Sequence, residues 1–121
     1  MPTKILVIDD EAIIRDLLQE FLSDLGYQVL LAEDGTKGIK LGTDNQISLA
    51  LVDLKLPDID GIQVIKKIRE KNPHLKFILL TGFPTPPVKM EAHQLGASGF
   101  LTKPFQLPEL QSLIQKALKG S

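Results

Sequence analysis

Short, almost wholly apolar segments alternate five times with segments of helical periodicity along this chain. Continuous hydrophobicity, rather than alternation with polar residues, is typical of strands that are buried on both faces of a parallel sheet. We therefore predict strands at Lys4–Ile8, Tyr27–Ala32, Ser48–Val52, Lys76–Leu80 and Gly99–Thr102. Five repeats of strand and helix require right-handed crossovers, so the sheet should be covered by helices on both sides.

The intervening segments predict five helices, at Ile14–Leu25, from Asp34 as a cap to about Leu41, at Gly61–Lys71, from about Pro87 to Leu95, and at Leu110–Leu118. Gly26 and Gly96 follow two of them as stop signals, and Pro73 ends the third. Pro84, Pro86 and Pro87 disfavour a helix through their stretch, so we expect the fourth helix to have a strained or mobile start. The pattern predicts a doubly wound, flavodoxin-like α/β fold with strand order 2-1-3-4-5 and five helices on its two faces.

The length of 121 residues suits one domain, which we place at 1–121, with 119–121 as the start of a linker or an expression remnant. No uninterrupted apolar run exceeds four residues, so we expect no contact with a membrane. The chain has no cysteine, which excludes thiol chemistry and fits a cytoplasmic location. Its net charge of −1 gives no reason to expect direct nucleic-acid binding.

Charged and hydroxyl side chains follow several predicted strands at the point where each strand ends. Asp9 and Asp10 follow the first strand, Asp53 the third, Thr81 the fourth and Lys103 the fifth. Because the carboxyl ends of parallel strands share one edge, the three aspartates should meet where strand order reverses. Three clustered carboxylates repel one another and raise one another's pKa, and Mg²⁺ would remove that repulsion. Acids, a divalent cation, a lysine and a hydroxyl together suit phosphoryl transfer to a carboxylate.

Five sequence segments in this order resemble the receiver domain of two-component response regulators, and the resemblance covers essentially the whole chain. The segments are VIDDE at 7–11, LVDLKLPDIDG at 51–61, LLTG at 79–82, LGA at 95–97 and FLTKPF at 100–105. The resemblance implies a phosphorylation-activated signalling switch, a phosphoacceptor domain that catalyses only its own phosphorylation and dephosphorylation. It also implies a sensor histidine kinase or phosphotransfer protein as partner, with an output domain in a longer native chain or a separate output protein.

The resemblance also assigns roles to particular residues. Asp53 would accept a phosphoryl group from a histidine kinase or a small phosphodonor. Asp10, Asp53 and the backbone carbonyl of Lys55 would bind Mg²⁺ directly, and Asp9 would act mainly through metal-bound water. Lys103 would contact the phosphoryl group, and its bond to Pro104 would be cis.

The switch residues implied by the resemblance are Thr81 and Phe100. Thr81 would hydrogen-bond to the phosphoryl group, and Phe100 would turn inward on activation. The face formed by the fourth and fifth strand–helix pairs would then change shape, and a phosphorylation-linked homodimer through that face is a further expectation.

Simpler structural roles exist for most of these residues. Asp9 or Asp10 would serve as a helix cap, Thr81 as an ordinary strand end, and Phe100 as part of the core. Glu11 is expected to begin the first helix rather than to join a site, and Asp58 and Asp60 to be turn and cap residues. His74 and His93 lack ligand spacing, so we expect solvent or packing roles for them.

Two other functions use related chemistry or the same fold. An aspartyl-phosphate phosphatase would need a second acid two residues after its nucleophile, where Asp9 has Glu11, and a substrate pocket for which this chain has little room. A flavin-binding module would need a hydroxyl- and amide-rich loop after the first strand. Asp9, Asp10 and Glu11 would repel a phosphate there.

Overall fold

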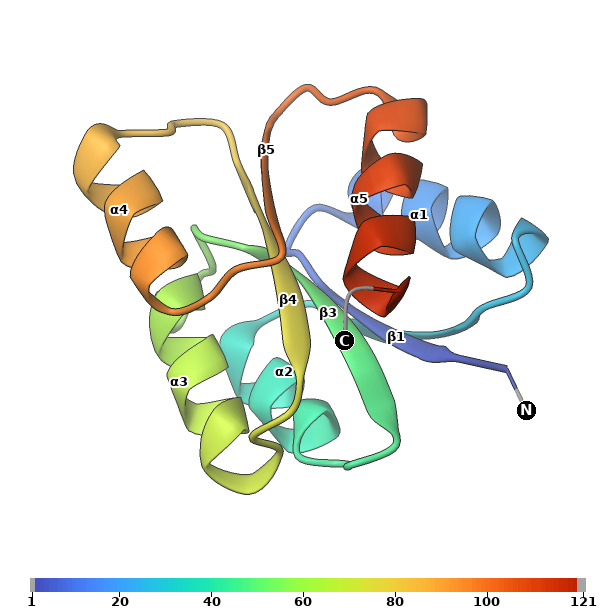
Figure 1. Ribbon diagram of the computed structural model, residues 1–121, viewed down its shortest axis with the longest axis horizontal. Helices are drawn as coiled ribbons and strands as arrows, with labels where there is room; N and C mark the ends of the chain where they lie inside the picture. Colours follow the sequence, from blue (N-terminus) through green and yellow to red (C-terminus); the bar gives the residue numbers. More distant parts are fainter. Residues whose placement is uncertain (1, 120–121) are drawn as a thin grey trace.

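The predicted parallel sheet forms the centre of the molecule, which we describe from a computed structural model covering residues 2–119 (Figure 1). Its strands lie in the order β2-β1-β3-β4-β5, as predicted from the sequence. They are β1 (Lys4–Ile8), β2 (Gln28–Ala32), β3 (Ile47–Asp53), β4 (Lys76–Thr81) and β5 (Gly99–Thr102). The prediction of a doubly wound, flavodoxin-like α/β fold is confirmed.

Five helices cover the two faces of this sheet (Figure 1). They are α1 (Ala12–Asp24), α2 (Gly35–Gly42), α3 (Gly61–Lys71), α4 (Pro86–Gln94) and α5 (Leu107–Lys119). Helices α1 and α5 lie on one face, and α2, α3 and α4 lie on the other. Among the described residues, no helix combines the length and the apolar character that crossing a membrane would require.

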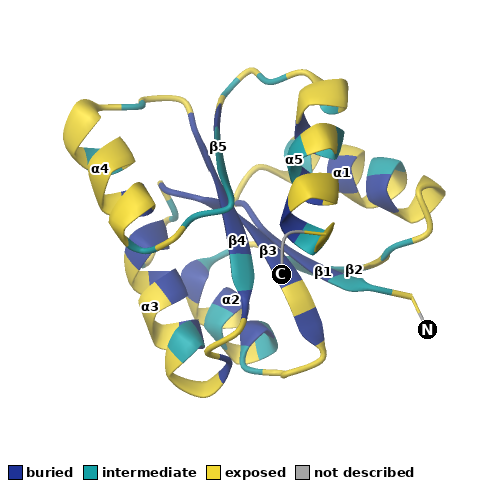
Figure 2. Ribbon diagram, in the orientation of Figure 1, coloured by how far each residue is buried: buried dark blue, intermediate teal, exposed yellow. Residues whose placement is uncertain are grey.

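Each strand contributes side chains to two separate hydrophobic cores, because successive residues of a strand point to opposite faces. In β1, Ile5 and Val7 pack with α1 and α5, whereas Leu6 and Ile8 pack with α2 and α3. Figure 2 shows the central strands largely buried, the edge strands β2 and β5 partly buried, and helices whose outer surfaces are exposed. The two cores explain why the strands are apolar almost throughout their length.

Helix ends follow the predicted local chemistry, although α1 begins at Ala12 rather than Ile14, α5 begins at Leu107 rather than Leu110, and α4 also starts early. Asp34 caps α2 through the Lys37 amide, and Gly26 and Gly96 follow α1 and α4 with φ of +95° and +82°. Helix α4 begins one residue earlier than predicted, at Pro86, since prolines are tolerated in a first turn. Its cap residue Thr85 has an ordinary extended backbone (φ −114°, ψ 153°), so no backbone strain is seen at that residue, and a strained or mobile start stays a prediction.

The loop between β3 and α3 is bonded to helices on both sides. Asp60 caps α3 by accepting a hydrogen bond from the Ile62 amide at 2.6 Å. Asp58 reaches the start of α2, where it accepts hydrogen bonds from the Gly35 amide at 2.8 Å, the Thr36 amide at 2.9 Å and the Thr36 hydroxyl at 2.6 Å. The Thr36 hydroxyl and these amides lower the pKa of the Asp58 carboxyl to about 2.

This low pKa predicts a pH dependence of stability. The pKa of Asp58 is lower in the folded state than in the unfolded state. The unfolded state therefore binds more protons at pH values between about 2 and the ordinary pKa of 3.8. The free energy of unfolding should therefore fall as pH is lowered through that range. The free energy of unfolding of Asp58→Asn should fall less steeply there. Urea unfolding of both proteins at closely spaced pH values measures this, and parallel curves would contradict it.

Candidate functional site

Four strands deliver polar side chains to the carboxyl edge of the sheet, as the sequence analysis expects. Asp9 follows β1, Asp53 ends β3, Thr81 ends β4 and Lys103 follows β5. Asp9 and Asp53 are buried, with 0% and 5% of their surface exposed, whereas Asp10 is exposed. Carboxylate oxygens of Asp9, Asp10, Asp53 and Glu11 all lie within 4.8 Å of one another.

Lys103 joins the acids of this cluster through its ammonium group. Its Nζ donates hydrogen bonds to Asp9 Oδ2 at 2.8 Å, to Asp53 Oδ2 at 3.0 Å and to Glu11 Oε1 at 3.0 Å. Burial alone would lower the pKa of Lys103, but the hydrogen bonds to Asp9, Asp53 and Glu11 outweigh it, so the net pKa is above the ordinary value. The Lys103 ammonium therefore stays charged at neutral pH, and its side chain is only 14% exposed.

The pKa of Asp9 is raised, but mainly for another reason than the one inferred from the sequence. Burial is the largest cause, since it disfavours the charged carboxylate. Hydrogen bonds from Lys103 and from the Glu11 amide oppose it, and the repulsion by Asp53 is the smallest contribution. The repulsion between clustered acids that the sequence predicts therefore contributes at Asp9, but burial is the larger cause of the raised pKa.

Glu11 is a member of the cluster that was not predicted from the sequence. It is the N-cap residue of α1, as its position predicts, yet its own carboxylate bonds to Lys103. Neither Asp9 nor Asp10 caps α1 in the usual way; instead Asp9 Oδ1 accepts a hydrogen bond from the Glu11 amide at 2.9 Å. The sequence shows that position 11 is acidic, but it does not show that this side chain contacts Lys103, which follows β5.

The backbone around Asp53 is packed closely against the start of α3. A Cβ atom at Gly61 would lie 2.9 Å from Leu54 Cα and still closer to the Asp53 carbonyl oxygen, so only glycine fits there. The Lys55 amide donates to Asp53 Oδ1 at 3.1 Å. Asp53 thus has one oxygen bonded to its own loop and the other bonded to Lys103.

Thr81 and Phe83 form another wall of this site. Thr81 is buried, and its Oγ accepts a hydrogen bond from the Phe83 amide at 3.1 Å. The ring of Phe83 is exposed, and Lys55 Nζ lies 4.6 Å from its centroid. These residues line a pocket of about 240 Å³ together with Lys103 and with three of the acids, Asp10, Glu11 and Asp53.

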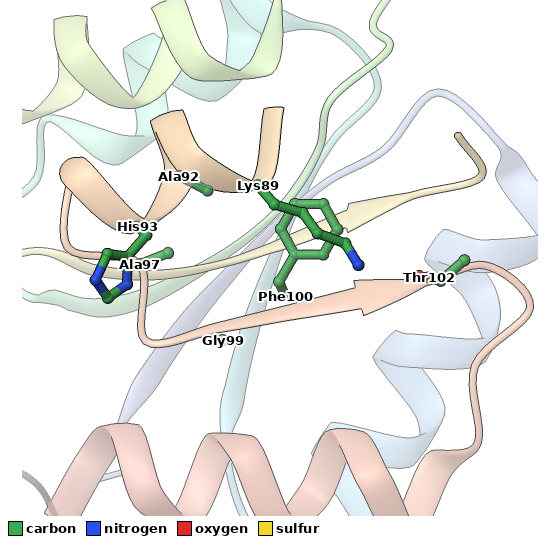
Figure 3. Close-up of a pocket in the computed structure, with 7 residues that line it drawn as sticks. All are labelled: Lys89, Ala92, His93, Ala97, Gly99, Phe100 and Thr102. Atoms are coloured by element: carbon green, nitrogen blue, oxygen red, sulfur yellow. The ribbon is translucent and has the colours of Figure 1, made fainter. Parts of the chain in front are cut away.

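Phe100 lies outside this pocket but on the same face of the sheet as Thr81. It pairs with Leu79, two residues before Thr81, so all three side chains point to one side. Its ring is half-buried between α4 and β5 beside a pocket of about 360 Å³, and Lys89 Nζ lies 5.9 Å from the ring centroid (Figure 3). The Lys103–Pro104 peptide bond is cis, as the resemblance implies.

A doubly wound α/β domain with an acidic, lysine-containing pocket at its topological switch point defines the class of this protein. The sequence profile of the response regulator receiver domain matches residues 5–115, and the chain belongs to that family. It is a phosphorylation-activated signalling switch, and neither a phosphatase nor a flavin-binding function is supported.

Similar proteins agree on this assignment. Sporulation initiation phosphotransferase F from Bacillus subtilis is 32% identical over 118 residues, which are 98% of this chain and 95% of that protein. A receiver domain protein from Methanospirillum hungatei has a TM-score of 0.94 at 28% identity, covering 99% of this chain and 96% of the other. A Burkholderia pseudomallei response regulator, solved with a phosphorylated aspartic acid, a calcium ion and citrate, has a TM-score of 0.85 at 26% identity, covering 98% and 70%. The chain spans about half the length of several other curated relatives.

Proposed function

We propose that Asp53 is the phosphoacceptor of this receiver domain. Asp53 is the acid in the pocket that is both buried and bonded through separate oxygens to Lys103 and to the Lys55 amide, and this observation carries the proposal. One carboxylate oxygen forms a bond to phosphorus while the bond between phosphorus and the donor breaks, and the donor leaves with that electron pair. Lys103 then pairs with the phosphoryl oxygens.

The acidic cluster fits a magnesium ion. Asp10, Asp53 and the Lys55 carbonyl would hold it directly, and Asp9 would act through bound water, because Mg²⁺ takes carboxylate, carbonyl and water oxygens. Four acids whose oxygens lie within 4.8 Å of one another support this assignment. The ion would supply positive charge to the phosphoryl oxygens during transfer. The Burkholderia response regulator was solved with both a phosphorylated aspartic acid and a calcium ion, which supports a divalent-cation site in this family.

Phosphorylation would change the surface around α4. The acyl phosphate adds roughly two negative charges, and Thr81 would move toward them and hydrogen-bond to the phosphoryl group. Phe100, diagonal to Thr81 across β4 and β5, would rotate into the vacated space. The β4-α4-β5-α5 face would then adopt a second shape, as a shift between two populations.

The partners and setting follow from the family. A sensor histidine kinase or phosphotransfer protein would donate the phosphoryl group, and an output domain or a separate protein would read the altered face. We propose one receiver domain over 1–121, acting in the cytoplasm, with a homodimer through α4-β5-α5 after phosphorylation. Of residues 119–121, expected to start a linker or to be an expression remnant, Lys119 is the last residue of α5, and residues 120 and 121 lie outside the described part of the chain.

Acetyl phosphate and Mg²⁺ test the central proposal without a kinase. Intact-mass measurement should show one added phosphoryl group on the wild-type chain, and chelation of Mg²⁺ should prevent it. Absence of any added mass with Mg²⁺ present would reject the phosphoacceptor function.

Asp10→Asn should weaken Mg²⁺ binding, because it removes an exposed carboxylate from the cluster. We expect at least about tenfold loss of affinity, as for the loss of a ligand or its partner in other metal sites. Titration calorimetry at pH 7 measures it, with Asp16→Asn on the exposed part of α1 as the control for charge. Equal affinities for Asp10→Asn and wild type would remove Asp10 from the metal site.

A further inference from the structure

The segment Leu54–Asp60 joins β3 to α3. It affects the proposed metal site through more than the Lys55 carbonyl, the one group in it that would coordinate the ion. It begins directly after Asp53, and it includes Lys55, whose amide bonds to Asp53 and whose carbonyl would face the ion. The distance between this loop and Asp9 and Asp10 therefore decides whether oxygens from both can bind one ion. Asp9 and Asp10 follow β1, so contacts that link β1 to the loop must set that distance.

Helix α2 contacts both β1 and the Leu54–Asp60 loop, although none of its residues lines the pocket of the site. A Cβ atom at Gly38 would lie 2.6 Å from the Ile8 side chain, which directly precedes Asp9. A Cβ atom at Gly35 would lie 2.9 Å from Val64 Cγ2 and still closer to Ile59 Cγ2 in the loop. The glycines thus let the helix backbone approach β1 and the loop simultaneously.

The loop is joined to α2 by what we call the Asp58 bridge, the three hydrogen bonds that Asp58 accepts from Gly35 and Thr36. The next donor of this helix end, the Lys37 amide, is bonded to Asp34 instead. Asp34 thus acts as the helix's own cap, while Asp58 connects the helix to another segment. The low pKa of the Asp58 carboxyl agrees with strong bonds at an otherwise exposed position.

We propose that Asp58 is a positioning residue for divalent-cation binding, which it supports by holding the Leu54–Asp60 loop against α2. The inference rests on the proposed function of the site. Asp58 touches neither the ion nor the phosphoryl group; it acts through the loop that presents the Lys55 carbonyl and Asp53. Because Gly38 of the same helix packs on Ile8, the bridge relates this loop to the strand β1, which Asp9 and Asp10 follow.

Paired alanine variants separate positioning from helix capping. Asp58→Ala removes the bridge, and Asp34→Ala removes a hydrogen bond from the same helix end without touching the loop. Calorimetric titration with Mg²⁺ should show affinity about tenfold weaker for Asp58→Ala, at the lower end of losses seen for groups that orient metal ligands. Asp34→Ala should stay within about twofold of wild type, as expected for a site without shared partners.

A milder variant guards against a general loss of folding. Thr36→Val keeps the two amide bonds to Asp58 but loses the hydroxyl bond, so its affinity should lie between those of wild type and Asp58→Ala. Thermal unfolding of all variants without Mg²⁺ shows whether each is folded during the titration. The Mg²⁺ concentration for half-maximal acetyl phosphate labelling should rise in the same order.

Three results would overturn the inference. Unchanged Mg²⁺ affinity in folded Asp58→Ala would show that the bridge does not position the site. Equal losses in Asp58→Ala and Asp34→Ala would show that α2 capping alone matters. A wild-type chain that neither binds Mg²⁺ nor accepts phosphate would overturn the proposed function as well, so the two failures are distinguishable.

Discussion

Asp53→Asn is expected to abolish phosphoryl incorporation from acetyl phosphate. The amide lacks the anionic oxygen that attacks phosphorus, and it cannot form the acyl phosphate. It also leaves Lys103 with one charged partner fewer in the pocket. Intact mass after incubation with Mg²⁺ and acetyl phosphate should show the wild-type chain labelled and the variant unlabelled.

Asp44→Asn is the matched control for this experiment. It removes the same charge before the amino end of β3, at the edge of the sheet opposite the site, where the Asp44 carboxylate bonds to the Gln46 amide. It should be labelled like wild type, and unfolding curves should show that both variants are folded. Labelling of Asp53→Asn at the wild-type rate would move the acceptor to another acid, and peptide mapping would then identify it.

The fold was predictable because its signals are local. Each strand is apolar on both faces, and helices α1 to α4 each have a glycine, proline or acidic residue at an end. The errors fall at the boundaries of the elements, where both pairing between strands and capping by neighbouring residues decide the last position. Strand β3 includes Asp53 because that residue pairs with Leu80, and α4 starts at Pro86 because Thr85 caps the helix in front of two prolines.

The convergence of Asp9, Asp10 and Asp53 was predictable from topology, since parallel strands place their carboxyl ends on one edge. The roles of Glu11 and Asp58 were not. Glu11 reaches Lys103, and Asp58 reaches a helix 22 residues earlier in the chain, so both depend on how long side chains or loops meet in three dimensions. The sequence predicts a turn role for Asp58, because its neighbours along the chain indicate only a turn and not the contact with α2.

Lys103→Ala is expected to destabilise the Mg²⁺-free protein by about 3 kcal/mol at pH 7, since removing one partner of a buried ion pair leaves a charge uncompensated. The affected charge is that of Asp9, which is fully buried and loses its 2.8 Å bond to the ammonium. Mg²⁺ should restore part of this stability, and it should stabilise the variant more than wild type, because the ion supplies the missing positive charge. Urea unfolding with and without Mg²⁺ measures both effects.

Lys66→Ala is the control variant, because it removes a lysine from an exposed ion pair outside the site. Its 3.6 Å pair with Glu91 is exposed on both sides, so its removal should cost under about 1 kcal/mol, and Mg²⁺ should not reverse that loss. A Lys103→Ala variant as stable as wild type without Mg²⁺ would mean that Asp9 is compensated by something other than the ammonium. If the variant is destabilised but Mg²⁺ leaves its stability unchanged, the acids do not share an ion. The two measurements together therefore test the charge balance on which the whole site depends.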